Sequence, residues 1–165
     1  MQTLQVQVAG ALSGKPLSPS ALFYAVKDFR SHGAIEYYSR SYGLPKQVAE
    51  EHFLELMKFL SIAAFNQGDV ITPSDQLDEM WHAMIIQTRE YDTLCERLGI
   101  RIHHATTGSP RREAYLNAIN LYRAEFGEPH PVWTTRKLKH DDTPLHTNDE
   151  ECVECGIYGW CSCHS

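Results

Sequence analysis

Three prolines, each directly preceded by a serine or a threonine, most constrain what this chain can fold into. They occur in the pairs Ser18-Pro19, Thr72-Pro73 and Ser109-Pro110. At a helix N-terminus the hydroxyl accepts a hydrogen bond from an unpaired backbone N–H, and proline in the next position has no N–H to leave unpaired. Each pair therefore predicts a helix start, and together they predict an all-α fold.

Apolar residues recur at helical spacing after each of these pairs, and also after Pro45. We expect main helices over residues 19–31, from 45 to about 65, over 73–98 and over 110–126, with a further short helix near 35–42. The third is the most regular, and Gly99 ends it in the left-handed conformation that glycine favours. Its apolar stripe consists of Leu77, Trp81, Met84, Thr88, Tyr91, Cys95 and Leu98. The fold predicted is a compact bundle of about four main helices.

The 165 residues fit one compact domain with an appendage. We place an N-terminal segment at residues 1–17 and the helical domain at 18–133. Residues 134–150 are polar and short of large hydrophobic side chains, which predicts a linker. A tail at residues 151–165 carries four of the five cysteines of the chain.

Charge and hydropathy exclude several classes of partner. The net charge of −6 argues against broad electrostatic capture of nucleic acid or of an anionic membrane, because both need a basic surface. No stretch approaches the roughly 20 apolar residues of a membrane span. Residues 1–17 lack the features of a secretory signal, so we expect the chain to stay in the reducing cytoplasm.

The tail carries the ligand pattern of a small metal knuckle. In a reducing compartment such clustered cysteines favour metal binding over disulfides, and tetrahedral zinc is the ion we expect. Iron and copper(I) stay open, as do unliganded thiols and a redox role. The ligands this prediction assigns are Cys152, Cys155, Cys161 and Cys163, with His164 as a substitute for one of them.

A second group of metal-ligand residues lies on the third expected helix and just after it. Asp78 and Glu79 precede His82 by four and three residues, so either carboxylate shares a helix face with the imidazole. With His103 and His104 they could form a catalytic metal site that keeps an open position. The alternative is structural, with the three histidines hydrogen-bonding backbone groups. Adjacent residues on an extended segment point apart, which argues against both His103 and His104 binding one ion.

Residues 54–133 resemble the bacterial glycine-rich domain-containing protein-like family, which is related to a domain of unknown function in plant glycine-rich domain proteins. The resemblance implies an α-helical domain and no established activity. It departs at residues 105–108, where relatives have a proline and then a glycine pair. The motifs that carry it are Phe59-Leu60, Ala63-Ala64, Val70 to Ser74, Leu77 to His82, Thr88 to Tyr91, His103-His104, Tyr122, Phe126 to Pro129 and Trp133.

Three functions follow as hypotheses. The first is a non-enzymatic helical module that binds a partner protein, with its tail held by zinc; the acidic balance and the lack of a catalytic triad favour it. The second is a metalloenzyme with His82, His103 and His104 as ligands and with Asp78 or Glu79 as a base or a fourth ligand. The third is nucleic-acid binding through the tail and the basic run Arg136, Lys137 and Lys139, which the following Asp141 and Asp142 oppose.

Overall fold

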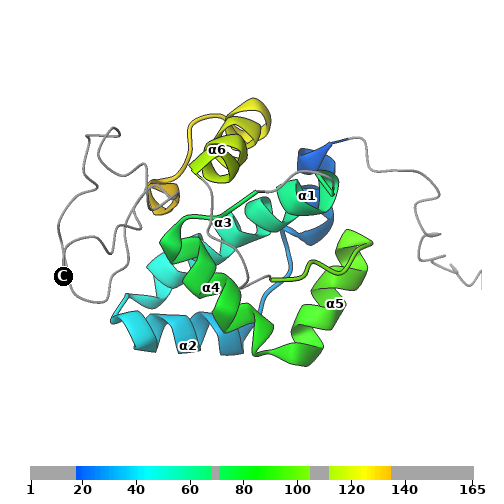
Figure 1. Cartoon of the computed structure of the whole chain (residues 1–165). Coiled ribbons are helices and arrows are strands. Elements are labelled where there is room, and N and C mark those ends of the chain that lie inside the picture. The colour runs from blue at the N-terminus through cyan, green and yellow to red at the C-terminus, as the bar shows by residue number, and fades with distance from the viewer. Residues whose placement is uncertain (1–17, 68–70, 105–111, 135–165) are drawn as a thin grey trace, which may run out of the picture.

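The structure is a computed structural model that describes residues 18–67, 71–104 and 112–134 (Figure 1). Within these ranges every regular element is a helix, so the expected all-α fold is confirmed. Six α-helices stand where four main helices and one short one were expected. They are α1 (Pro19–Val26), α2 (His32–Tyr42), α3 (Lys46–Phe65), α4 (Asp75–Ile85), α5 (Thr88–Leu98) and α6 (Arg112–Phe126), followed by the 3₁₀-helix η1 (Pro131–Trp133).

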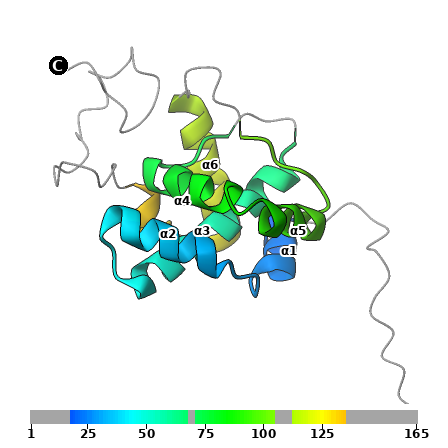
Figure 2. The same cartoon turned by 90° about the horizontal axis from the view of Figure 1, so that it is seen from below.

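Helix α3 lies at the centre and packs against α1, α2, α4 and α6 (Figures 1 and 2). It buries residues on most of its circumference, as a helix enclosed by others must. In Figure 1 α2 runs below α3 and α6 crosses above it, and α4 lies beside both α2 and α3. The largest fully buried side chains include Trp133, Tyr38, Tyr122, Phe53, Phe59, Ile35, Leu56 and Met57.

The first helix begins where the sequence predicts and ends early. The hydroxyl of Ser18 accepts a hydrogen bond from the Ala21 amide at 3.1 Å. Beyond the end of the helix at Val26, the guanidinium of Arg30 donates to the Lys27 and Phe29 carbonyl oxygens. The chain then starts α2 at residue 32, with Ser31 as its N-cap.

The long third helix of the prediction is divided into α4 and α5 at Ile86 and Gln87. Gln87 leaves helical geometry, with φ −85° and ψ 64°. The break lets α5 turn onto α1, whereas α4 packs on α2 and α3. Neither glycine nor proline marks it, and the apolar stripe continues through it because the two helices face the same core. Of the stripe, only Thr88 is exposed; it is the first residue of α5.

The N-cap of α4 is Ser74 rather than Thr72. The Ser74 hydroxyl accepts from the Leu77 amide at 3.4 Å and donates to the Val132 carbonyl at 2.6 Å, which ties the start of α4 to η1. Thr72 lies outside the helix, and its amide donates to the Ala114 carbonyl oxygen of α6. The third pair, residues 109–110, lies outside the described residues, as do residues 1–17, 135–150 of the linker and the tail.

Among the described helices none combines the length and the apolar character needed to cross a lipid bilayer.

Candidate metal centre

Helix α4 presents a carboxylate and an imidazole on one face, one turn apart, and a second imidazole reaches them from the segment after α5. These residues are Asp78, His82 and His104. The Nε2 atom of His104 lies 2.8 Å from Oδ1 of Asp78, and Nδ1 of His82 lies 3.7 Å from Oδ2 of the same carboxylate. The two imidazole rings have centroids 4.5 Å apart. One donor atom from each of the three residues lies within 4.8 Å of the other two, and we call this set the donor triangle.

Buried aromatic residues fix the position of His104. The hydroxyl of Tyr91 donates to the carbonyl oxygen of Ile102 at 2.6 Å and accepts from the indole N–H of Trp81 at 3.1 Å. The Trp81 ring also packs edge-on against the His104 ring, with centroids 4.6 Å apart, and against Phe59 of α3. Burial raises the pKa of Tyr91 to about 12, so it keeps the proton it donates. These contacts of Trp81 and Tyr91 therefore hold the His104 ring against α4.

The donor triangle is open to solvent on one side. The side chain of His104 is 16% exposed and that of Asp78 30%, whereas that of His82 is 46% exposed. An ion held by these three groups would therefore have protein on one side and water on the other. Structural zinc sites are closed by four protein ligands, whereas catalytic ones have three and leave a position to water.

The other two residues of the predicted second site lie differently. His103 is exposed and is not part of the donor triangle, as expected for the neighbour of an inward residue on an extended segment. Glu79 lies beside the triangle, with Oε2 at 3.8 Å from Nδ1 of His82, and is not one of its three members. The structure thus brings together three of the five predicted residues and places a fourth next to them.

The spacing of the donors suits a transition-metal ion. A tetrahedral zinc ion with ligand distances of about 2.1 Å holds neighbouring donor atoms roughly 3.4 Å apart. The distances of 2.8 Å to Oδ1 of Asp78 and 3.7 Å to its Oδ2 are each within 1 Å of that value, and one donor atom of each residue lies within 4.8 Å of the others. Two imidazoles with one carboxylate, and no thiolate, suit zinc, and also non-haem iron(II) when several positions stay open.

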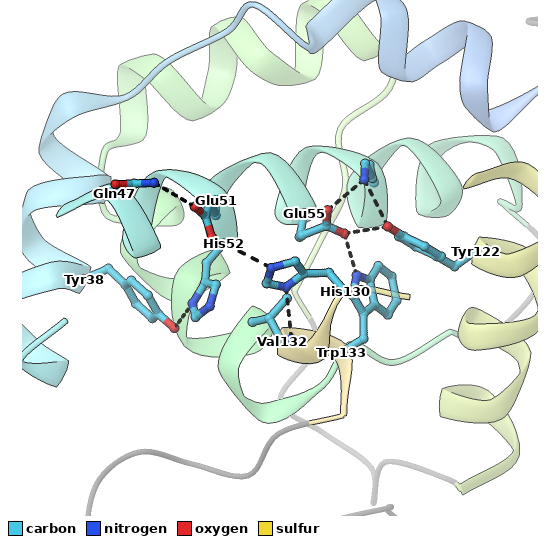
Figure 3. Close-up of polar contacts among 10 residues, drawn as sticks. Tyr38, Gln47, Glu51, His52, Glu55, Tyr122, His130, Val132 and Trp133 are labelled. Atoms are coloured by element: carbon cyan, nitrogen blue, oxygen red, sulfur yellow. Dashed lines mark hydrogen bonds and ion pairs between the residues drawn. The ribbon is translucent and has the colours of Figure 1, made fainter. Parts of the chain in front are cut away.

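A separate polar cluster, centred on Glu55 of α3, was not expected from the sequence (Figure 3). Its Oε2 accepts from the Tyr122 hydroxyl and from the Trp133 indole N–H, both at 2.9 Å. Its Oε1 accepts from the Lys58 ammonium at 2.7 Å. Burial lowers the pKa of Lys58, but hydrogen bonds to Glu55 and Tyr122 outweigh burial and raise it. The cluster joins α3 to α6 and η1, and its mutual hydrogen bonds indicate a structural role.

One signal could have revealed this cluster: Glu55 is a carboxylate between Leu54 and Leu56, inside an otherwise apolar stretch of helix. A buried carboxylate requires donors, but its partners are 3, 67 and 78 residues away along the chain. No local spacing rule connects the two distant ones. The sequence could therefore indicate an anomaly at Glu55 without naming what resolves it.

Nearer the N-terminus of α3, the side chain of His52 is buried. Its Nδ1 is hydrogen-bonded to the hydroxyl of Tyr38 at 3.0 Å, and its ring packs against that of His130 (Figure 3). Burial, followed by the neighbouring His130, lowers the pKa of His52 to about 4; the charges of Glu51 and Glu55 oppose this shift but do not cancel it. His130 in turn faces Glu51, with Nε2 to Oε2 at 4.0 Å.

The His52 shift predicts acid destabilisation. In the unfolded chain a histidine has a pKa near 6.5, so the unfolded state takes up the proton first as the pH falls. The stabilisation by neutral His52 is complete above pH 6.5, declines as pH falls to about 4, and amounts to at most about 3 kcal/mol. Urea unfolding at steps from pH 7.5 to 4 measures this change in the free energy of unfolding. The variant His52→Asn, which keeps an acceptor for Tyr38 without titrating, should show a flatter profile; equal slopes would contradict the assignment.

No protein-family model matches this chain, and no curated protein or solved structure is significantly similar to it. The resemblance of residues 54–133 to the glycine-rich domain-containing protein-like family therefore stays a prediction.

Proposed function

We propose that this protein binds a divalent transition-metal ion, with zinc as the first expectation, through Asp78, His82 and His104. The observation that carries the proposal is the convergence of three donor atoms from two separate segments within 4.8 Å. The i, i+4 spacing on α4 places Asp78 and His82 together. His104 is held beside them by hydrogen bonds of the Tyr91 hydroxyl to Trp81 and to the Ile102 carbonyl oxygen. Without an ion, the same groups form a hydrogen bond between His104 and Asp78.

A metal-dependent enzyme is the second candidate function, and the exposure of His82 favours it. Because three protein donors leave at least one coordination position to solvent, water or a substrate could reach the ion. A bound ion would lower the pKa of such a water toward neutrality and supply a nucleophile. A helical module that binds a partner protein stays a proposal on the acidic balance of the chain, and a zinc site at Cys152, Cys155, Cys161 and Cys163 with His164 stays a separate proposal.

The test must separate the two proposed sites within the full chain. We define a tail-serine protein in which the four tail cysteines, at 152, 155, 161 and 163, are replaced by serine. After dialysis against zinc and then buffer, elemental mass spectrometry should find about one ion per chain in this protein. It should find none when Asp78→Asn and His82→Gln are added. The unmodified chain should hold a second ion if the tail also binds zinc. A tail-serine protein that retains no ion would refute the proposal.

A further inference from the structure

Helix α2 turns one side toward the core and leaves the opposite side exposed. Its buried residues Ala34, Ile35 and Tyr38 face inward, where α2 packs against α3 and α4. In Figure 1 the helix lies along the lower left edge of the described fold. Its outer side forms an open groove of about 470 Å³, lined by Gly33, Glu36, Tyr37, Arg40 and Ser41. These positions recur at helical spacing, so they share one face of α2.

An exposed aromatic ring and an ion pair occupy this face. Tyr37 is 52% exposed, and tyrosine is among the residues that protein interfaces favour. Glu36 and Arg40 form an ion pair across one turn, and both side chains are exposed. An ion pair this exposed contributes little to the stability of the fold, so both charges remain available to a partner.

The N-terminal end of the groove is closed by the junction between α4 and α5. A Cβ atom at Gly33 would lie 2.7 Å from Oε1 of Gln87, so the two segments are in close contact there. Ile86, the chain neighbour of Gln87, is 54% exposed. The groove thus contains one of the large exposed apolar side chains of the described residues, and a second one belongs to the junction at its end.

We infer that this face of α2 binds the same face of a second copy of the chain, as an antiparallel pair of α2 helices around a two-fold axis. The order of the charges carries the inference. A copy turned by 180° about an axis midway between Glu36 and Arg40 sets each of these residues opposite its counterpart of opposite charge. The face is therefore self-complementary, as a two-fold contact requires. A parallel pair in register would instead set like charges against each other.

The net charge of the chain favours this face as the place of contact. Two copies that each carry a net charge of −6 repel at long range. The groove has one acidic and one basic residue in its lining, so contact there adds nothing to the repulsion. A strongly charged partner of either sign would find no matching surface on it. One side of one helix is less than the 1,200–2,000 Å² or so of a stable interface, so we expect a weak, reversible dimer.

Sedimentation velocity measures this self-association on the unmodified chain, over concentrations from about 5 to about 500 µM that suit a weak interface. A chelator and a reductant are present, so that neither metal ions nor disulfides join two copies. We expect the average mass to rise toward that of a dimer. Glu36→Arg and Arg40→Glu, each alone, should weaken association at least about 10-fold, because each places four like charges around the axis. Tyr37→Ser should weaken it as well.

A mixture of the two charge variants distinguishes docking from a merely structural effect. One Glu36→Arg chain and one Arg40→Glu chain again set opposite charges face to face, so the mixture should associate at least as strongly as the parent. A helix weakened within its own chain is not repaired by mixing. The matched controls are Asp92→Arg and Arg101→Glu, which reverse the charges of another exposed ion pair and should associate as the parent does.

Three results would overturn the inference. They are a parent that stays monomeric over the whole range, single charge variants that associate as the parent does, and a mixture that does not regain association. Because no metal takes part in the measurement, each of these results leaves the proposed metal binding standing. Loss of zinc binding at the donor triangle would in turn leave the docking face untouched.

Discussion

Replacing Trp133 by alanine should lower the free energy of unfolding by about 4 kcal/mol, which is among the larger costs known for a buried aromatic residue. Trp133 is completely buried, and its ring packs against Tyr122 and Phe59, with centroids 4.7 and 6.0 Å away. The substitution removes these contacts and leaves a cavity. It also removes the indole N–H that Glu55 accepts, so a buried carboxylate loses one of its donors. Urea unfolding followed by far-ultraviolet circular dichroism measures the effect.

The control variant is Trp133→Phe, which keeps an aromatic ring in the core and deletes the indole N–H. We expect it to cost about 1–3 kcal/mol, since the hydrogen bond to Glu55 is lost while much of the volume stays filled. Domains of this kind are stable by only about 5–15 kcal/mol, so the alanine variant would be close to unfolding at raised temperature. If Trp133→Ala lost less than about 1 kcal/mol, η1 and Glu55 would not be central to the core.

Replacing His104 by alanine should weaken zinc binding at least about 100-fold, because the loss of a ligand exceeds the 10- to 100-fold typical of a residue that only hydrogen-bonds to a ligand. His104 is a member of the donor triangle, 2.8 Å from Asp78, and its loss leaves two protein donors on a solvent-exposed helix. Two donors on the surface compete poorly with water for a divalent ion. Chelator competition on the tail-serine protein measures the affinity.

His103→Ala is the matched control, because it changes the same residue type at the adjacent position. His103 is exposed and lies outside the donor triangle, so its removal should change zinc affinity by less than about twofold. Equal losses in the two variants would indicate that the pair binds zinc without regard to orientation, and the assignment to His104 would then be wrong. If both variants kept the zinc affinity of the parent, His104 would not be a ligand.

Local chemistry predicted the helices best where it acts within one turn. The Ser18 cap, the start of α3 after Pro45 and the glycine end of α5 all follow from neighbouring residues. The break between α4 and α5 was missed because it depends on which partners the two halves pack against. The cap at Ser74 was missed for a similar reason, since its hydroxyl is also engaged by the distant Val132.

In the candidate site, too, local spacing was predictable from the sequence and long-range contacts were not. The four-residue spacing of Asp78 and His82 places both on one face of any helix, and the structure has them so. Which of His103 and His104 turns inward depends on the Tyr91 hydroxyl bonding to the Ile102 carbonyl, and no spacing rule contains that contact.

Long-range ¹H–¹⁵N NMR of the imidazole nitrogens, during a zinc titration of the ¹⁵N-labelled tail-serine protein, tests the central claim most directly. The chain has nine histidines, and the method reports on each ring separately. We predict that one nitrogen of His82 and one of His104 shift on zinc binding and stop titrating with pH, while His103 is unchanged. If neither His82 nor His104 responds, or if the response is confined to His164 in the tail, the donor triangle is a hydrogen-bonded clamp and not a metal site.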